Sequence, residues 1–192
     1  MSRDFALSQP LCRSRIGHFA IAAGHRILSV APVVVGGMTT TPAKATQVSQ
    51  TFRLEYATRI EVHATPQRIW ALLTNAAEFP RWNSTVTRIA GTIAQGERLS
   101  VEVAAAPGRT FKPRVTTLEP ERRMVWSDGF SPMFKAARTF TLSARSDGMT
   151  EFSMVEVLSG VMLPMIKGSL PDFRPAFEAY AADLKREAER AA

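Results

Sequence analysis

Arginine, glutamate and tyrosine are the residues on which any chemistry of this sequence would rest, because the common catalytic motifs are missing. There is one cysteine, Cys12, and of the three histidines only His63 follows residue 37. The sequence has no Ser/His/Asp order, no His-Glu-x-x-His motif, no phosphate-binding glycine loop and no Cys/His metal spacing. We therefore expect no cofactor and no metal.

A predicted β-hairpin brings one arginine and one glutamate together. Ser146-Asp147-Gly148 suits a three-residue loop with Gly148 in a left-handed conformation, which pairs Arg145 with Met149. The same register then pairs, on one face of the sheet, Leu142 with Phe152, Phe140 with Met154, and Arg138 with Glu156. A shift by one residue would pair core-facing with solvent-facing side chains, which the pleat forbids. We expect Arg138 and Glu156 together on the helix-facing side.

Two interpretations of this pair stay open at the level of sequence. It is either a structural ion pair near the end of the sheet or the polar contact of a ligand in a cavity. An enzyme could use such groups to polarise carbonyls and move protons, since a carboxyl group in a dry pocket has a raised pKa. The candidates for that role are Arg138, Glu156, Arg114 and Tyr180.

Strands must position these side chains. Turn residues such as Gln95-Gly96 and Asp128-Gly129 separate stretches with apolar residues at strand spacing. The predicted strands are 52–63, 86–94, 97–105, 109–118, 123–127, 135–144 and 149–159. The segments between them are too short for crossover helices, so the sheet should be antiparallel.

Helices flank the strands in the sequence. Thr65 before Pro66 predicts a capped helix that ends near Asn75, within a region of short helices after the first strand. Asp172 could cap a longer C-terminal helix, whose apolar residues recur at helical spacing: Phe173, Phe177, Tyr180, Leu184 and Ala188. This order predicts an α+β fold with helices on one side of the sheet.

The first 37 residues differ from the rest by carrying four arginines, one aspartate and no lysine or glutamate. Charged residues interrupt the apolar stretch that a secretory signal needs, and the uncharged run 27–43 is shorter than the about 20 apolar residues of a membrane-spanning helix. We predict a poorly ordered extension over residues 1–50 and a domain over 51–192, with Met38 as an alternative start. We also expect a cytoplasmic protein without stable membrane insertion.

The basic balance does not indicate nucleic-acid binding. The net charge is +7 and the pI about 10.3, but the basic residues are spread over many elements and no helix-turn-helix or zinc-finger pattern is present. We expect no nucleic-acid partner, and the sequence does not indicate an oligomeric state.

Several motifs resemble one superfamily. They are the segment from Ala64-Thr65-Pro66 to Thr74-Asn75, Phe79-Pro80-Arg81-Trp82-Asn83, Arg109-Thr110-Phe111-Lys112-Pro113-Arg114-Val115, Met124-Val125-Trp126, and Glu156-Val157-Leu158-Ser159-Gly160. Together they resemble the START-like (SRPBCC) superfamily, in its bacterial polyketide cyclase/dehydrase-like branch, over roughly residues 52–189. The resemblance implies a helix-grip fold. This is a curved antiparallel sheet, here of seven strands, wrapped around a long C-terminal helix beside a hydrophobic cavity.

The resemblance also implies a site and a function. We expect a cavity that binds or carries a small hydrophobic or amphipathic ligand, lipid- or polyketide-like. Its lining would be Val101, Phe111, Pro113, Val115, Met124, Trp126, Phe134, Arg138, Phe140, Met154, Glu156, Phe177 and Tyr180. One alternative is a cyclase/dehydratase-like enzyme that uses the same cavity. Another is a stress-related or regulatory interaction module with a vestigial pocket. The identity of the ligand does not follow from the sequence.

Overall fold

The computed structural model describes residues 42–190, and all structural statements below concern these residues. The elements follow one another as β1 (Lys44–Ser49), β2 (Arg53–Val62), α1 (Pro66–Thr74), η1 (Ala76–Glu78), α2 (Phe79–Trp82), β3 (Val86–Ala90), β4 (Ser100–Val103), β5 (Thr110–Phe111), β6 (Arg114–Glu119), β7 (Arg123–Phe130), β8 (Phe134–Ala144), β9 (Thr150–Ser159), α3 (Leu163–Ile166), η2 (Lys167–Ser169) and α4 (Arg174–Ala188).

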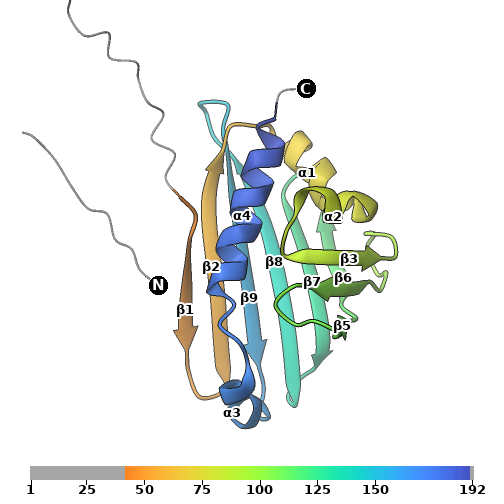
Figure 1. Ribbon diagram of the computed structural model, residues 1–192, viewed down its shortest axis with the longest axis vertical. Helices are drawn as coiled ribbons and strands as arrows, with labels where there is room; N and C mark the ends of the chain where they lie inside the picture. The colour runs from red at the N-terminus through yellow and green to blue at the C-terminus, as the bar shows by residue number, and fades with distance from the viewer. Residues whose placement is uncertain (1–41, 191–192) are drawn as a thin grey trace, which may run out of the picture. The chain divides into compact units, whose positions relative to one another are not determined.

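The strands form two antiparallel sheets (Figure 1). Six strands form the main sheet in the order β1-β2-β9-β8-β7-β6, and β3, β4 and β5 form a second sheet of three. The α+β class and the antiparallel arrangement are confirmed. The prediction of a single seven-stranded sheet is wrong, because the described residues contain nine strands, which form two sheets.

The predicted strand 109–118 is divided between the two sheets. Thr110–Phe111 pairs with β4, whereas Arg114–Glu119 pairs with β7. Pro113 lies at the break, where a residue without an N–H group interrupts a strand ladder at little cost. The carbonyl of Pro113 accepts a hydrogen bond from the N–H of Leu99, so the chain stays attached to the second sheet while it changes partner.

Strand β1 lies within the segment that was predicted to be poorly ordered. All six residues of β1 pair with residues 54–59 of β2, and β1 forms one edge of the main sheet. The backbone N–H of Ala45 also donates to Glu178 of α4 at 2.9 Å. The prediction of poor order is therefore wrong for β1, while residues 1–41 lie outside the described residues.

The predicted hairpin register is confirmed. β8 and β9 pair Leu142 with Phe152, Phe140 with Met154, and Arg138 with Glu156. Gly148 has φ +80°, the left-handed conformation that a side chain disfavours, and the N–H of Arg145 donates to Met149 at 2.8 Å.

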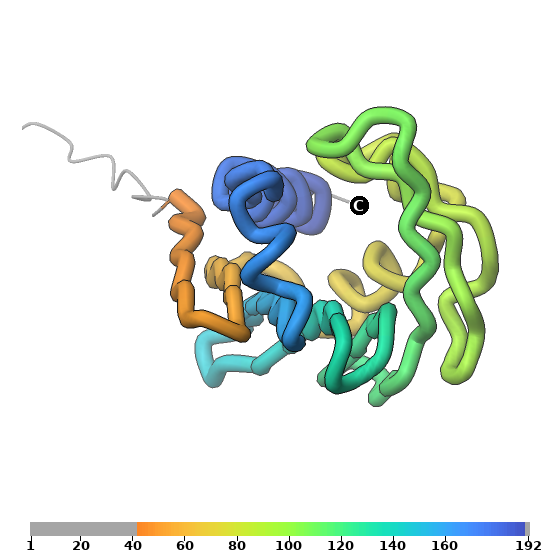
Figure 2. The backbone as a smooth tube through the Cα atoms, turned by 90° about the horizontal axis from the view of Figure 1, so that it is seen from below, coloured from red at the N-terminus to blue at the C-terminus, as the bar shows by residue number. Residues whose placement is uncertain are grey.

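The helices cover one face of the main sheet. Thr65 caps α1 through a hydrogen bond that its side chain accepts from Arg68, as predicted. The long helix α4 lies mainly over β2 and β1. Figure 2 shows α4 and the three-stranded sheet on opposite sides of this face. Phe173 rather than Asp172 is the residue before α4, although Asp172 accepts a hydrogen bond from the Arg174 N–H. No helix among residues 42–190 is long and apolar enough to cross a membrane.

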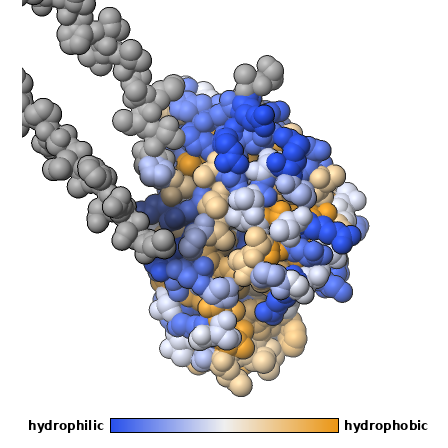
Figure 3. Space-filling view, in the orientation of Figure 1, coloured by the Kyte–Doolittle hydropathy of each residue, from blue (hydrophilic) through white to orange (hydrophobic). Residues whose placement is uncertain are grey.

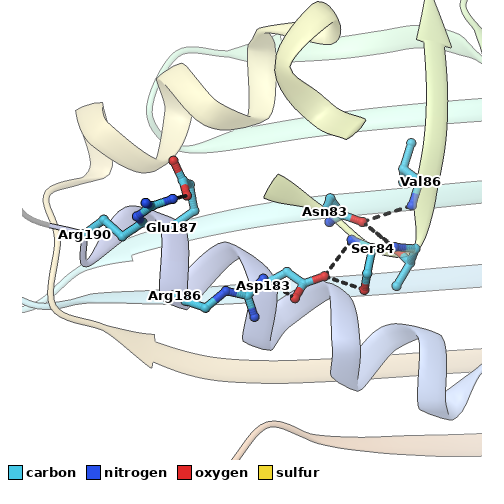
Figure 4. A network of polar contacts seen from close by, with 8 residues as sticks. Asn83, Ser84, Val86, Asp183, Arg186, Glu187 and Arg190 are labelled. Carbon is cyan, nitrogen blue, oxygen red and sulfur yellow. Dashed lines mark hydrogen bonds and ion pairs between the residues drawn. The ribbon is translucent and has the colours of Figure 1, made fainter. Parts of the chain in front are cut away.

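A buried polar network fastens α4 to the turn between α2 and β3 (Figure 4). Asp183 is buried and accepts hydrogen bonds from the N–H and the hydroxyl of Ser84, at 2.7 and 2.6 Å. Asn83, also buried, accepts from the N–H groups of Thr85 and Val86. These bonds fix the turn against α4, and so they fix the distance between the helix and the second sheet.

Candidate functional site

One row of side chains crosses the main sheet on the face that carries the helices. Cross-strand pairing joins Tyr56 of β2 to Glu156 of β9, Glu156 to Arg138 of β8, Arg138 to Trp126 of β7, and Trp126 to Val115 of β6. The row thus places one anion and one cation between aromatic neighbours.

Arg138 and Glu156 form a partly buried ion pair at the centre of this row. Nη2 and Nε of Arg138 lie 2.5 and 3.2 Å from the same carboxylate oxygen, Oε2 of Glu156. The two side chains are 21% and 18% exposed. The guanidinium carbon also lies 5.3 Å from the centre of the Phe177 ring of α4, a cation–π distance. The pair is therefore held between the sheet and the helix and still reaches solvent.

A buried aromatic cluster lies next to the pair, toward α1 and α2. The ring of Tyr180 is 5.9 Å from Trp82, 6.0 Å from Phe140 and 6.2 Å from Phe152, and stacks on the last. Trp126 lies 5.1 Å from Phe140. All five residues are buried. This cluster is the apolar floor of the site.

Three of these aromatic side chains bury polar atoms without a hydrogen-bond partner among residues 42–190. They are the indole N–H groups of Trp82 and Trp126 and the hydroxyl of Tyr180. Burial raises the pKa of Tyr180 well above its usual value, and the nearby Arg138 only partly opposes this. The Tyr180 hydroxyl therefore stays protonated at neutral pH, which makes it a hydrogen-bond donor and not a base.

The thirteen residues predicted to line the site fall into two groups. Eight are buried in the core: Val101, Val115, Met124, Trp126, Phe140, Met154, Phe177 and Tyr180. Five are half-buried: Phe111, Pro113, Phe134, Arg138 and Glu156. A ligand on this face would thus meet the second group first and would reach the first group only at its inner end.

Arg114, one of the four residues proposed for catalysis, lies elsewhere. It alternates with buried Val115 along β6, so it is on the opposite face of the sheet. Its guanidinium is exposed and donates to the carbonyl of Gly96 at 2.6 Å. The structure therefore brings together Arg138 and Glu156, with Tyr180 close by, and leaves Arg114 out.

Two open grooves occur outside the predicted lining. The first, of about 600 Å³, lies between the beginning of β2 and the connection from α3 to α4, and Leu54, Tyr56, Lys167 and Leu170 are among its lining residues. The second, of about 650 Å³, lies between α4 and the chain around Ala43. None of the thirteen predicted lining residues borders either groove. Tyr56 lines the first groove and also belongs to the row of side chains that crosses the main sheet.

Sequence reasoning missed Tyr56 and Asp183. Tyr56 contacts both Phe173 and Phe177, with ring centres 5.5 and 5.8 Å away, and burial raises the pKa of its hydroxyl, with Asp172 adding to the rise. Tyr56 belongs to the row because β2 pairs with β9, two strands that are adjacent in space but far apart in the sequence. An alternating pattern in β2 could have shown which way Tyr56 faces, but not which residue lies beside it.

The architecture defines the class: two antiparallel sheets and a long terminal helix that lies across the larger one. The family model described as "Polyketide cyclase / dehydrase and lipid transport" matches residues 53–191, and the chain belongs to this family. The resemblance seen in the sequence is thereby confirmed. No curated protein matches the sequence.

Solved structures support the same fold. A protein of Rhodobacter sphaeroides is 22% identical with a TM-score of 0.55, over 76% of this chain and 96% of that chain. A START superfamily protein from Mycobacterium smegmatis is 16% identical with a TM-score of 0.51, over 71% and 97% of the two chains. CalU16 from Micromonospora echinospora is 14% identical with a TM-score of 0.51, over 78% and 90%. These similarities establish the fold.

Proposed function

We propose that the domain binds a small apolar or amphipathic molecule on the helix-facing side of the main sheet, with the polar group of that molecule at Arg138 and Glu156. The position of this ion pair is the main support for the proposal. It is about one-fifth exposed and has a buried aromatic cluster on one side. A ligand that places its apolar part over the half-buried residues would bring a polar group within reach of the guanidinium.

The contacts of the pair support a role in binding. Nε and Nη2 of Arg138 both donate to the same carboxylate oxygen of Glu156. Within residues 42–190, Nη1 of Arg138 and Oε1 of Glu156 have no hydrogen-bond partner. A ligand carboxylate or carbonyl could therefore bond to Nη1 without breaking the pair.

A cyclase/dehydratase reaction is supported by fewer residues. Arg114 lies on the other face, and the buried Tyr180 hydroxyl is protonated at neutral pH, so it could act as an acid but not as a base. Glu156 is the remaining carboxylate of the row, and it is already bonded to Arg138. Binding without turnover is the function that these residues support best.

Binding of two fluorescent probes to the full chain tests the proposal. We use 11-(dansylamino)undecanoic acid, which has a carboxylate, and N-phenyl-1-naphthylamine, which is neutral. Arg138→Met should raise the Kd of the first at least about tenfold, because a charge-assisted hydrogen bond is worth about 1.5–3 kcal/mol. The Kd of the neutral probe should change less than twofold.

Arg59→Met is the matched control. Arg59 of β2 pairs with Glu151 of β9 on the other face of the main sheet, at 3.4 Å, so its loss also removes one cross-strand ion pair. This variant should leave both Kd values unchanged. If neither probe binds wild-type protein, or if both arginine variants weaken the acid equally, the proposed site is wrong. The second result would point to a general effect of charge.

A further inference from the structure

Six of the seven exposed large hydrophobic side chains among residues 42–190 gather at one end of the domain. Met165 is 81% exposed and Phe130 is 68% exposed. The other four are Phe52, Met133, Val161 and Met162. They come from three connections: the β1–β2 turn, the β7–β8 turn and the chain from β9 into α3. We call these six residues the apolar tip; in Figure 1 the three connections meet at the lower end, around α3.

Backbone hydrogen bonds hold the three connections together. The N–H of Gly160 donates to Phe52, that of Val161 to Pro132, and that of Met162 to Met133, all at 3.0 to 3.1 Å. A Cβ atom at Gly160 would lie 2.2 Å from the carbonyl oxygen of Met133, so the backbones are in close contact. The apolar tip is thus a fixed surface feature, and its exposure is not the result of one loose side chain.

Exposing large apolar side chains to water is energetically unfavourable. Monomeric proteins rarely leave several large apolar side chains in one exposed cluster unless the cluster meets a partner. The lower end of the space-filling view is coloured as mostly hydrophobic over this region (Figure 3). Met162 and Met165 have flexible thioether side chains, which adapt to irregular apolar surroundings.

Positive charge flanks the apolar tip. Lys135 follows Phe134 at the end of the β7–β8 turn, and Lys167 directly follows α3. Among residues 42–190 neither lysine takes part in an ion pair, whereas Arg53 nearby is paired with Glu55, and Nζ of Lys167 donates to the carbonyl of Gln50 at 3.3 Å. Asp128, two residues before Phe130, is likewise without an ion pair and accepts from the N–H of Gly129, so the two lysines leave a net positive charge here. Apolar side chains together with unpaired lysines suit a surface that has an apolar interior and anionic head groups.

We infer that the apolar tip docks reversibly onto an anionic lipid surface, inserting Phe130 and Met165 while Lys135 and Lys167 meet the head groups. A second copy of the chain fits less well. The exposed side chains come from three narrow turns at one end of an elongated domain, whereas a stable interface buries about 800 Å² on each partner. Unpaired lysines would also meet equal charges in a symmetric dimer.

The tip lies close to the candidate site along the same strands. Arg138 follows Phe134 by four residues in β8, which is about 13 Å at the rise of a strand. The first groove, which reaches Tyr56, is also lined by Lys167 at this end. Docking would therefore bring the site near the lipid phase, but the inference rests on the surface and not on the proposed ligand.

Flotation of the full chain with vesicles tests the inference. Vesicles of phosphatidylcholine and phosphatidylglycerol in a 3:1 ratio are compared with phosphatidylcholine alone. We expect wild-type protein to float with the anionic vesicles and the double variant Phe130→Glu/Met165→Glu to lose at least tenfold in partition coefficient. Lys135→Gln/Lys167→Gln should weaken binding to anionic vesicles and reduce its dependence on salt.

Ala144→Glu/Ser146→Glu is the matched control, because it adds two negative charges at exposed positions near the opposite end of β8. It should float like wild-type protein.

As a second measurement, the tryptophan in Met165→Trp should give a blue-shifted fluorescence emission with vesicles, and brominated lipid should quench that emission. Wild-type protein that floats with neither vesicle, or a tip variant that floats normally, would overturn the inference. So would a dimer in light scattering that the tip variant abolishes, since it assigns the surface to a second copy. Probe binding at Arg138 is measured separately and can succeed or fail independently.

Discussion

Tyr180 shows what a single buried polar atom costs. Its hydroxyl is buried without a partner among residues 42–190, and a polar group left in this way costs about 1–3 kcal/mol. Tyr180→Phe keeps the ring contacts with Trp82, Phe140 and Phe152. We therefore expect the ligand-free variant to gain about 1 kcal/mol in the free energy of unfolding, measured by urea denaturation with tryptophan fluorescence.

Phe140→Leu provides the comparison for Tyr180→Phe, because it disturbs the same cluster by changing apolar volume. It should destabilise the protein by about 1–2 kcal/mol, as core reshaping usually does. A loss of stability in Tyr180→Phe of similar size would show that the hydroxyl makes a hydrogen bond in solution, for example to a buried water molecule.

At the scale of elements, Asp183 is the strongest connection between α4 and the turn before β3. Burial by itself raises the pKa of Asp183, but hydrogen bonds from Ser84 and Arg186 outweigh it and lower the pKa below its usual value. A lowered pKa in the folded state means that the unfolded chain binds the proton first. Stability is therefore present above about pH 4, the usual range for a carboxyl group, and is lost as the pH falls through the lower folded-state pKa.

Asp183→Asn should therefore cost about 1.5–3 kcal/mol at pH 7, since the bonds are made to a charged group. The variant should also show a smaller loss of stability between pH 5 and pH 3 than wild-type protein does, measured by urea denaturation at each pH. Asp147→Asn, in the exposed β8–β9 turn, is the control and should follow the wild-type curve. Parallel pH curves for wild-type protein and Asp183→Asn would contradict the assignment.

At the scale of the whole molecule, the main sheet depends on β1 as its edge. A chain that starts at Pro42 keeps β1, whereas a chain that starts at Thr51 loses it together with the buried side chain of Ala45 and the bond from Ala45 to Glu178. We expect the first to melt within about 2 °C of the full chain and the second to melt about 6 °C lower or more. Melting is followed by circular dichroism. Equal melting temperatures would mean that β1 adds no stability.

The local parts of this fold could be predicted from the sequence. A threonine before a proline defines the start of α1, and a short turn with Gly148 fixes the register of β8 and β9, because both depend on neighbours within about ten residues. That register was enough to place Arg138 beside Glu156. Alternation alone also suffices to place Arg114 on the face opposite to Val115.

Only the tertiary structure decided what lies around that pair. The pairing of Tyr56 with Glu156 and the connection of Asp183 to Ser84 join residues about 100 positions apart, and the contact of Arg138 with Phe177 spans about 40. Polar and apolar patterns specify which side of a strand or helix is buried, but not which distant segment buries it. The turns of the apolar tip converge for the same reason, because the β1–β2 turn joins the others only through the pairing of β2 with β9. The division into two sheets has a more local origin, since the strands on each side of Pro113 pair with different neighbours.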